Sequence, residues 1–187
     1  PQHELVPDAT YALGVAQDQL KQPDQAVATF AAFLQKFPKH ALADECRFRQ
    51  AEALFTLKKF PEAEALFAQC VVAKDFPYAD FALLRQAGCM SDRGQPAQAA
   101  ALYQTLPQKF PKSQYVAAAG LAAGKCLYLA DQFPQARTVL GPLLPQKVPE
   151  AAEAAYWTAR AFLKEKNPAA ALQALDAAIA ANPQSPV

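Results

Sequence analysis

The chain has 187 residues, a formal net charge of +1 and a hydrophobic content of 52%. The near-neutral charge argues against a nucleic-acid partner, which needs a basic surface, and no apolar run is long enough to insert into a membrane. The hydrophobic content excludes a disordered chain, and the rarity of isoleucine and threonine favours helices over strands.

Apolar residues return at helical spacing in ten segments along the chain, which follow one another in pairs. We predict helices over 8–20 and 24–36, 42–58 and 62–73, 78–92 and 97–109, 114–130 and 135–146, and 150–165 and 169–181. Gly141 and Pro142 interrupt the segment 135–146, so we expect that helix to bend or to end early.

Many of the sixteen prolines are placed periodically. One set stands at the start of each second helix, where the missing N–H of proline costs no hydrogen bond: Pro23, Pro61, Pro96, Pro134 and Pro168. A second set is expected to end these helices, because the residue before a proline avoids helical geometry: Pro38, Pro77, Pro111, Pro149 and Pro183.

Small and bulky residues repeat with the prolines. Each second helix carries an alanine followed four residues later by a bulky side chain, as in the pairs Ala26/Phe30, Ala63/Phe67, Ala99/Tyr103, Ala136/Leu140 and Ala171/Leu175. Twelve residues before each alanine stands another small residue: Gly14, Ala51, Ala87, Gly124 and Ala159. A fixed period of 35 to 37 residues is typical of stacked repeats, in which small side chains let paired helices approach closely.

This pattern resembles the tetratricopeptide repeat (TPR), whose consensus has a small residue at position 8, alanine at 20, an aromatic residue at 24 and proline at 32. In the first repeat these are Gly14, Ala26, Phe30 and Pro38, whereas the consensus tryptophan at position 4 and tyrosine at position 11 are missing throughout. The resemblance implies an all-α fold, a right-handed α-solenoid of five tandem helix-turn-helix repeats in a single domain spanning 1–187. The expected repeats are about 7–40, 41–78, 79–113, 114–149 and 150–183.

A narrower resemblance rests on the longer units and the aromatic-proline stops Phe37-Pro38, Phe76-Pro77 and Phe110-Pro111. These look like units of bacterial envelope proteins, such as the Tol-Pal system coordinator and the outer-membrane assembly lipoproteins. The sequence leaves the compartment open, but this resemblance favours a periplasmic or envelope-associated location over a cytoplasmic one. The chain starts without methionine and stops just after the fifth repeat without a capping helix, so we expect a fragment of a longer chain, or a second chain that covers this end.

The residues needed for catalysis are scarce. His3 and His40 have no acidic or nucleophilic neighbour at the spacing of a general base, and the six glycines form no phosphate-binding loop. The cysteines, which are too far apart for a zinc site, are Cys46, Cys70, Cys89 and Cys126. We therefore predict neither enzymatic activity nor a cofactor or metal. Cys89 and Cys126 should pack against adjacent repeats, and a Cys46–Cys70 bridge is disfavoured but left open.

In the TPR fold the first helices of the repeats line a concave groove, and the resemblance implies which positions face it. The predicted partner-binding residues are Tyr11, Phe48, Phe55, Phe81, Leu84, Leu121, Lys125, Tyr128, Tyr156, Arg160 and Lys164. Such an aromatic-rich strip would suit the side chains of a bound peptide. The alternative is that the position-5 residues, such as Leu121, pack within the wall of the solenoid and support it.

Charge divides the predicted groove. Its acidic residues gather in the first two repeats (Asp8, Asp18, Glu45 and Glu52), and its basic residues in the last two (Lys125, Arg160 and Lys164, against Glu153). We hypothesise a ligand whose basic part lies toward the first repeats; the alternative is a solvated charged face. Position 5 is apolar, so the carboxylate clamp of chaperone-binding members, with lysine at 5 and asparagine at 9, is absent.

The predicted function is therefore a protein–protein interaction scaffold that binds a peptide or helix of a partner protein in a concave groove. The alternative is a structural module that self-associates through its uncapped C-terminal repeat, or that holds together other domains or subunits of an envelope assembly. A concentration series by sedimentation should distinguish the two.

Overall fold

A computed structural model of the chain describes residues 5–181, and within that range it contains helices, turns and loops but no strand. The predicted fold class, an all-α solenoid of tandem helix-turn-helix repeats, is confirmed. Two predictions fall outside the described residues. They are the helix end at Pro183 and the absence of a catalytic role for His3. The chain divides into two compact units, Pro1–Arg93 and Gly94–Val187.

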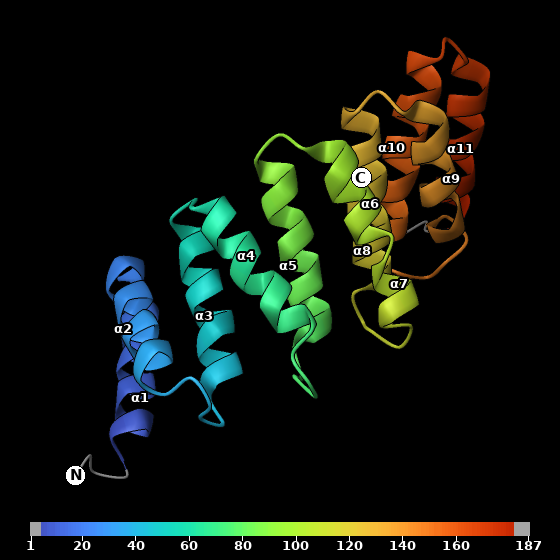
Figure 1. Ribbon diagram of the computed structural model, residues 1–187. Coiled ribbons are helices and arrows are strands. Elements are labelled where there is room, and N and C mark those ends of the chain that lie inside the picture. Colours follow the sequence, from blue (N-terminus) through green and yellow to red (C-terminus); the bar gives the residue numbers. More distant parts are fainter. Residues whose placement is uncertain (1–4, 182–187) are drawn as a thin grey trace. The chain divides into compact units, whose positions relative to one another are not determined.

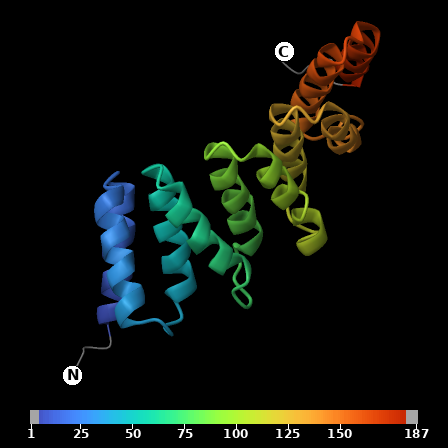
Figure 2. The same cartoon turned by 45° about the horizontal axis from the view of Figure 1, so that its top comes forward.

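In unit 1, each helix packs against the next one in the chain, and α1 also contacts α3 (Figures 1 and 2). The helices are α1 (Val6–Gln19), α2 (Pro23–Lys36), α3 (Ala43–Thr56), α4 (Phe60–Val71) and α5 (Ala79–Asp92). Two clusters of buried side chains fill the spaces between them, one around Phe30 and Phe33 and the other around Phe67. The core of unit 1 thus runs from helix pair to helix pair.

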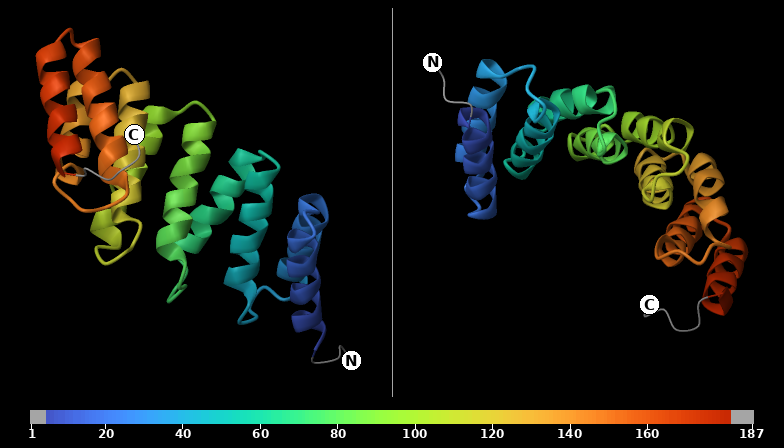
Figure 3. Two further views of the ribbon diagram at one scale, coloured as in Figure 1. Left: turned by 180° about the vertical axis from the view of Figure 1, so that it is seen from behind. Right: turned by 90° about the horizontal axis from the view of Figure 1, so that it is seen from below.

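In unit 2, α8 packs on α6, α9 and α10, and α10 and α11 lie side by side (Figure 3). Its elements are α6 (Pro96–Tyr103), α7 (Leu106–Lys109), α8 (Val116–Leu129), α9 (Phe133–Leu140), the 3₁₀ helix η1 (Gly141–Leu143), α10 (Glu150–Lys164) and α11 (Pro168–Ala181). A buried cluster of Leu121, Leu140, Leu143 and Ala154 joins α8, α9, η1 and α10.

The glycines at the helix crossings confirm the role that the sequence pattern predicted for small residues. A Cβ atom added to Gly14 in α1 would lie 2.6 Å from the ring of Phe30 in α2. At Gly124 in α8 an added Cβ would overlap the side chain of Leu140 in α9. In both repeats the bulky residue of the second helix fills the space that the missing side chain leaves.

The first set of prolines lies at the first or second position of the second helices, as predicted. The predicted helix 135–146 ends early, as expected, because α9 stops at Leu140. The predicted helix 97–109 is wrong as a single helix, because it breaks into α6 and α7. Pro107 cannot donate a hydrogen bond to the carbonyl of Tyr103, and its ring would clash with that carbonyl in a continuous helix. At the break between the two helices, the N–H and the hydroxyl of Thr105 both donate to the carbonyl of Leu102, at 3.0 and 2.8 Å.

Two prolines of the second set do not end helices, contrary to the prediction. Helix α4 ends at Val71, well before Pro77, and residues 72–78 form a loop in which Asp75 has a φ of 55°. Pro149 comes after η1 and stands directly before α10 as its N-cap residue. In both cases the chain has already left the helix when it reaches the proline, so the proline shapes the loop.

A left-handed residue closes the turn between the two helices of every repeat. These residues are Lys21, Lys58, Gly94, Asp131 and Lys166, with φ between 57° and 74°. At the second of these turns the N–H of Lys58 donates to the carbonyl of Phe55, and that of Lys59 to the carbonyl of Leu54, both at 2.9 Å. This pattern satisfies the last carbonyls of the first helix and reverses the chain.

Candidate partner-binding surfaces

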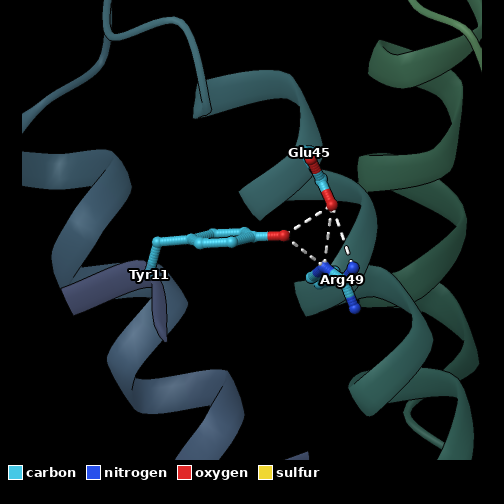
Figure 4. Close-up of polar contacts among 3 residues, drawn as sticks. All are labelled: Tyr11, Glu45 and Arg49. Carbon is cyan, nitrogen blue, oxygen red and sulfur yellow. Dashed lines mark hydrogen bonds and ion pairs between the residues drawn. The ribbon is translucent and has the colours of Figure 1, made fainter. Parts of the chain in front are cut away.

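Tyr11, a predicted groove residue, links the first two repeats (Figure 4). Its hydroxyl donates to Glu45 Oε1 at 2.5 Å and accepts from Arg49 Nε at 2.9 Å, while Arg49 Nη2 donates to Glu45 Oε1 at 2.9 Å. Burial and the bond to Glu45 raise the pKa of Tyr11. The three polar groups therefore satisfy one another between α1 and α3.

Phe48 of α3 lies at the centre of an aromatic cluster. Its ring centroid is 5.7 to 5.9 Å from the centroids of Phe67, Phe76, Tyr78 and Phe81. Sequence reasoning missed Phe76 and Tyr78 as neighbours of Phe48, because both flank Pro77 and that proline indicated only a helix stop. Phe48 itself is partly buried and packs on the core, whereas Tyr78 is 49% exposed.

Phe55 and Phe81 both contact Arg85, which was not among the predicted site residues. The guanidinium carbon of Arg85 lies 3.9 Å from the ring centroid of Phe55 and 5.9 Å from that of Phe81. Its Nε and Nη2 donate to the two carboxylate oxygens of Glu52 at 2.6 and 3.0 Å. The only available signal was that Arg49 and Arg85 occupy the same repeat position. Leu84, also predicted, is half-buried on the same helix.

In unit 2 two predicted residues are buried in the wall. Leu121 is 9% exposed and belongs to the buried cluster with Leu140. This matches the alternative expectation, in which a position-5 residue packs within the wall of the solenoid and supports it. Tyr128 is 7% exposed, with its ring centroid 5.4 Å from that of Phe133 and 5.1 Å from that of Trp157. The sequence did not point to Trp157, the single tryptophan of the chain, because the repeat consensus has its tryptophan at another position.

The remaining predicted residues of unit 2 gather around Arg160. Its guanidinium carbon lies 4.9 Å from the ring centroid of Tyr128, 5.5 Å from that of Tyr156 and 4.7 Å from that of Trp157. Tyr156 is 51% exposed, and Lys164 is exposed one turn after Arg160 on α10. We call this group of Tyr128, Tyr156, Trp157, Arg160 and Lys164 the Arg160 surface.

Lys125 and Glu153 border the Arg160 surface and pair with each other. Lys125 Nζ donates to Glu153 Oε1 at 2.8 Å, and Trp157 Nε1 donates to the same oxygen at 3.1 Å. The bond from Lys125 lowers the pKa of Glu153. The single acidic residue predicted for this end of the groove is therefore already occupied.

The described histidine and the cysteines have contacts within the fold. His40 accepts a hydrogen bond from the N–H of Leu42 at 3.2 Å and packs edge-on against Phe33. All four cysteines are buried, and Cys46 and Cys70 are not bridged, which answers the question left open for this pair. Among residues 5–181, no group of three or more histidine, cysteine and acidic side chains could hold a metal ion. In the same range no helix is both long and apolar enough to span a membrane.

Comparisons with known proteins identify the repeat. Two family models of the tetratricopeptide repeat match the chain, one at residues 121–186 and the other at residues 8–40 and 81–113, which together cover more than half of it. No curated protein matches the sequence. Repeat scaffolds of this family are typically non-enzymatic and mediate protein–protein interactions. The narrower resemblance to envelope proteins gains no support from these comparisons.

Several solved structures share the fold at low sequence identity. YrrB, described as a TPR protein with an unusual peptide-binding site, has a TM-score of 0.70 and 16% identity over 94% of this chain and 86% of YrrB. MamA from Desulfovibrio magneticus RS-1 has a TM-score of 0.75 and 12% identity over 97% of each chain. The apo form of RapI has a TM-score of 0.78 and 11% identity over 95% of this chain and 54% of RapI. With its family matches and its repeated helix pairs, the chain belongs to the tetratricopeptide-repeat proteins.

Proposed function

We propose that the chain is an adaptor that binds a peptide or a helix of a partner protein along the first helices of its repeats. The observation that carries the proposal is the exposure of large apolar side chains on first helices of unit 2. Leu129 is 61% exposed, Tyr156 51% and Leu163 55%, and all three lie on α8 or α10. Neighbouring exposed apolar side chains mark interaction sites, and tyrosine and arginine are enriched among the energetically important residues of interfaces.

The contacts between side chains on the first helices support the same proposal. Tyr128 and Trp157 hold the side chain of Arg160, and Tyr11 and Arg49 connect α1 to α3, so a ligand would meet side chains that are already ordered. Binding to a preformed surface avoids much of the entropy cost of ordering loops and rotamers. The peptide-binding site described for YrrB, which shares this fold, is a further reason to favour a peptide ligand.

We also propose that both units belong to one solenoid domain of five repeats spanning 1–187. A family match covers residues 81–113 and so crosses the boundary between Arg93 and Gly94 at which the two compact units meet in the sequence. A repeat matched across this boundary supports counting both units as parts of one array of repeats.

An affinity capture with matched variants tests the adaptor proposal. Tyr156→Ser/Leu163→Ser removes two exposed apolar side chains from α10, and Leu172→Ser/Ile179→Ser removes two from α11, a second helix on which they are 61% and 57% exposed. Quantitative mass spectrometry of proteins retained from a cell lysate should show an approximately tenfold loss for the α10 variant. The α11 variant should retain what the wild type retains. Equal retention by all three proteins would contradict binding through the first helices.

Self-association is a second candidate function, and the exposure of Leu172 and Ile179 on one face of α11 favours it. Burying such a face against a second copy would stabilise an oligomer through the hydrophobic effect. Sedimentation velocity over a concentration series should then show a mass that rises for the wild type and for Tyr156→Ser/Leu163→Ser. Leu172→Ser/Ile179→Ser should stay monomeric. A wild type that is monomeric at all concentrations would exclude this function.

A further inference from the structure

Arg85 in unit 1 and Arg160 in unit 2 both lie against aromatic rings, but their hydrogen-bonding edges differ. Arg85 stacks on Phe55 and donates two hydrogen bonds to the carboxylate of Glu52. Arg160 lies over three rings, and the hydrogen bond found for it is from Nη1 to the hydroxyl of Tyr156, at 3.5 Å. Among residues 5–181 Arg160 forms no ion pair with a carboxylate.

The faces of the aromatic rings position the guanidinium group of Arg160 but accept no hydrogen bonds from the edge of that group. A guanidinium group that lies over aromatic rings gains a cation–π interaction through its face, while its N–H groups still point outward in the plane of the group. These N–H groups match the two oxygens of a carboxylate, and charge-assisted bonds of this kind are about twice as strong as neutral ones. Arg85 with Glu52 shows within this chain that a ring-stacked arginine takes a carboxylate in this way.

The charges around Arg160 favour an anion from outside. Glu153, the acidic residue at the border of the Arg160 surface, already accepts hydrogen bonds from Lys125 and Trp157. Lys164, one turn after Arg160, is exposed and forms no ion pair among the described residues. The Arg160 surface is therefore net positive, and Glu153 is already bonded elsewhere when a carboxylate approaches Arg160.

Exposed apolar side chains lie on both sides of Arg160 along α10. Tyr156 is one turn before it and 51% exposed, and Leu163 is one turn after it and 55% exposed. A ligand that covers both must extend past Arg160 in both directions. This arrangement fits an acidic side chain inside a peptide segment better than the carboxylate at the end of a chain.

We propose that the Arg160 surface binds an aspartate or glutamate side chain within an apolar segment of a partner protein. The guanidinium of Arg160 donates to the carboxylate, and Tyr156 and Leu163 contact the apolar residues on either side of it. The inference rests on the adaptor function proposed above and specifies the chemistry of its ligand.

Two display libraries of random peptides test this inference on the full chain. In one library the peptides are flanked by carrier protein on both sides, and in the other they have free C-termini. The flanked library should enrich peptides with an aspartate or glutamate next to apolar residues. In a synthetic copy of an enriched peptide, replacing the acid by its amide should raise the Kd about tenfold or more.

Variants of the chain locate the effect. Arg160→Gln should raise the Kd by the same factor, and the amide peptide should lose little more on this variant, because both changes remove one interaction. Arg160→Lys keeps the charge but not the planar fork, so it should recover only part of the affinity. Lys147→Gln, which loses the same charge in the loop before α10, is the matched control and should leave the Kd unchanged. The amide peptide reports on the carboxylate even if a variant folds poorly.

Three results would overturn the inference. Enriched peptides without an acidic residue would overturn it while the adaptor function stands, since a peptide would still be bound. Enrichment from the free-C-terminus library alone would identify a terminal carboxylate as the ligand instead. Enrichment from neither library would remove the adaptor function together with the inference.

Discussion

At the scale of single residues, burial decides what the cysteine thiols can do. Cys46, Cys70 and Cys89 have no exposed surface, and burial raises the pKa of each to about 12. The thiolate is the reactive form of cysteine, and at pH 8 a pKa of about 12 leaves roughly one thiol in ten thousand ionised. These residues therefore serve as small apolar side chains in the core of unit 1.

We expect these three thiols to react with a disulfide reagent at pH 8 only when the chain opens. Labelling of the native protein should be much slower than labelling of a short cysteine peptide, and denaturant should accelerate it in step with the loss of helical circular dichroism. The raised pKa also has a consequence for stability, since it favours the folded state below the ordinary pKa of 9.0 and this contribution is lost as the pH rises toward 12. Rapid labelling of two or more thiols in the native protein would contradict the buried positions, because only Cys126 lies outside this group of three.

At the scale of helices, close approach depends on the absence of a side chain at the crossing. Gly124 in α8 lies directly against Leu140, which is completely buried, whereas Gly120 on the same helix is 3.6 Å from Leu143 when a Cβ is added. The second distance is an ordinary van der Waals contact. Two glycines of one helix thus differ in the space around them, and the difference can be measured.

Gly124→Ala should lower the free energy of unfolding by roughly 1–3 kcal/mol, because the added methyl group displaces Leu140 in a packed core. Gly120→Ala should raise it by up to about 1 kcal/mol, because alanine is the better helix former and the methyl group fits. Urea unfolding followed by circular dichroism gives both values. If the two substitutions shift the unfolding midpoint in the same direction, the crossing at Gly124 is not as tight as described.

Most helices could be predicted from the sequence, because the 35- to 37-residue period fixed their order and the first prolines marked their starts. The break between α6 and α7 was missed since Pro107 stands inside an otherwise regular apolar pattern. The positions of Tyr11, Phe48 and Arg160 on first helices followed from the resemblance. Their contacts did not, because the partners Arg49, Tyr78 and Trp157 depend on how neighbouring helices are rotated against one another, which no periodicity records.

At the scale of the molecule, the acidic and basic residues predicted for the two ends of the groove differ in how far they are paired within the chain. Glu45 and Glu52 in unit 1 are bonded to Arg49 and Arg85, so most of their charge is compensated within the chain. In unit 2, Lys125 is paired with Glu153, while Arg160 and Lys164 remain without a carboxylate among the described residues. The electrostatic attraction for an acidic ligand should therefore come from unit 2.

Charge reversal tests this distribution with a peptide enriched in the library selection. Arg160→Glu/Lys164→Glu should slow association about tenfold at low salt, and the difference should shrink as salt screens the charges. Glu45→Gln, which removes a paired acid in unit 1, should change the association rate little. Stopped-flow fluorescence measures both rates over a range of salt concentrations. Unchanged kinetics for the double reversal would reject steering by the Arg160 surface.

The left-handed turn positions between paired helices should accept D-amino acids. A backbone with positive φ is unfavourable for L-amino acids but natural for their mirror images, and the same turn position has it in all repeats. A D-alanine introduced by chemical synthesis at Lys58 or Asp131 should therefore be accommodated without loss of helix, whereas the same residue inside α3 or α8 would interrupt it. The turns thus mark the places where this chain of L-residues would tolerate inverted chirality.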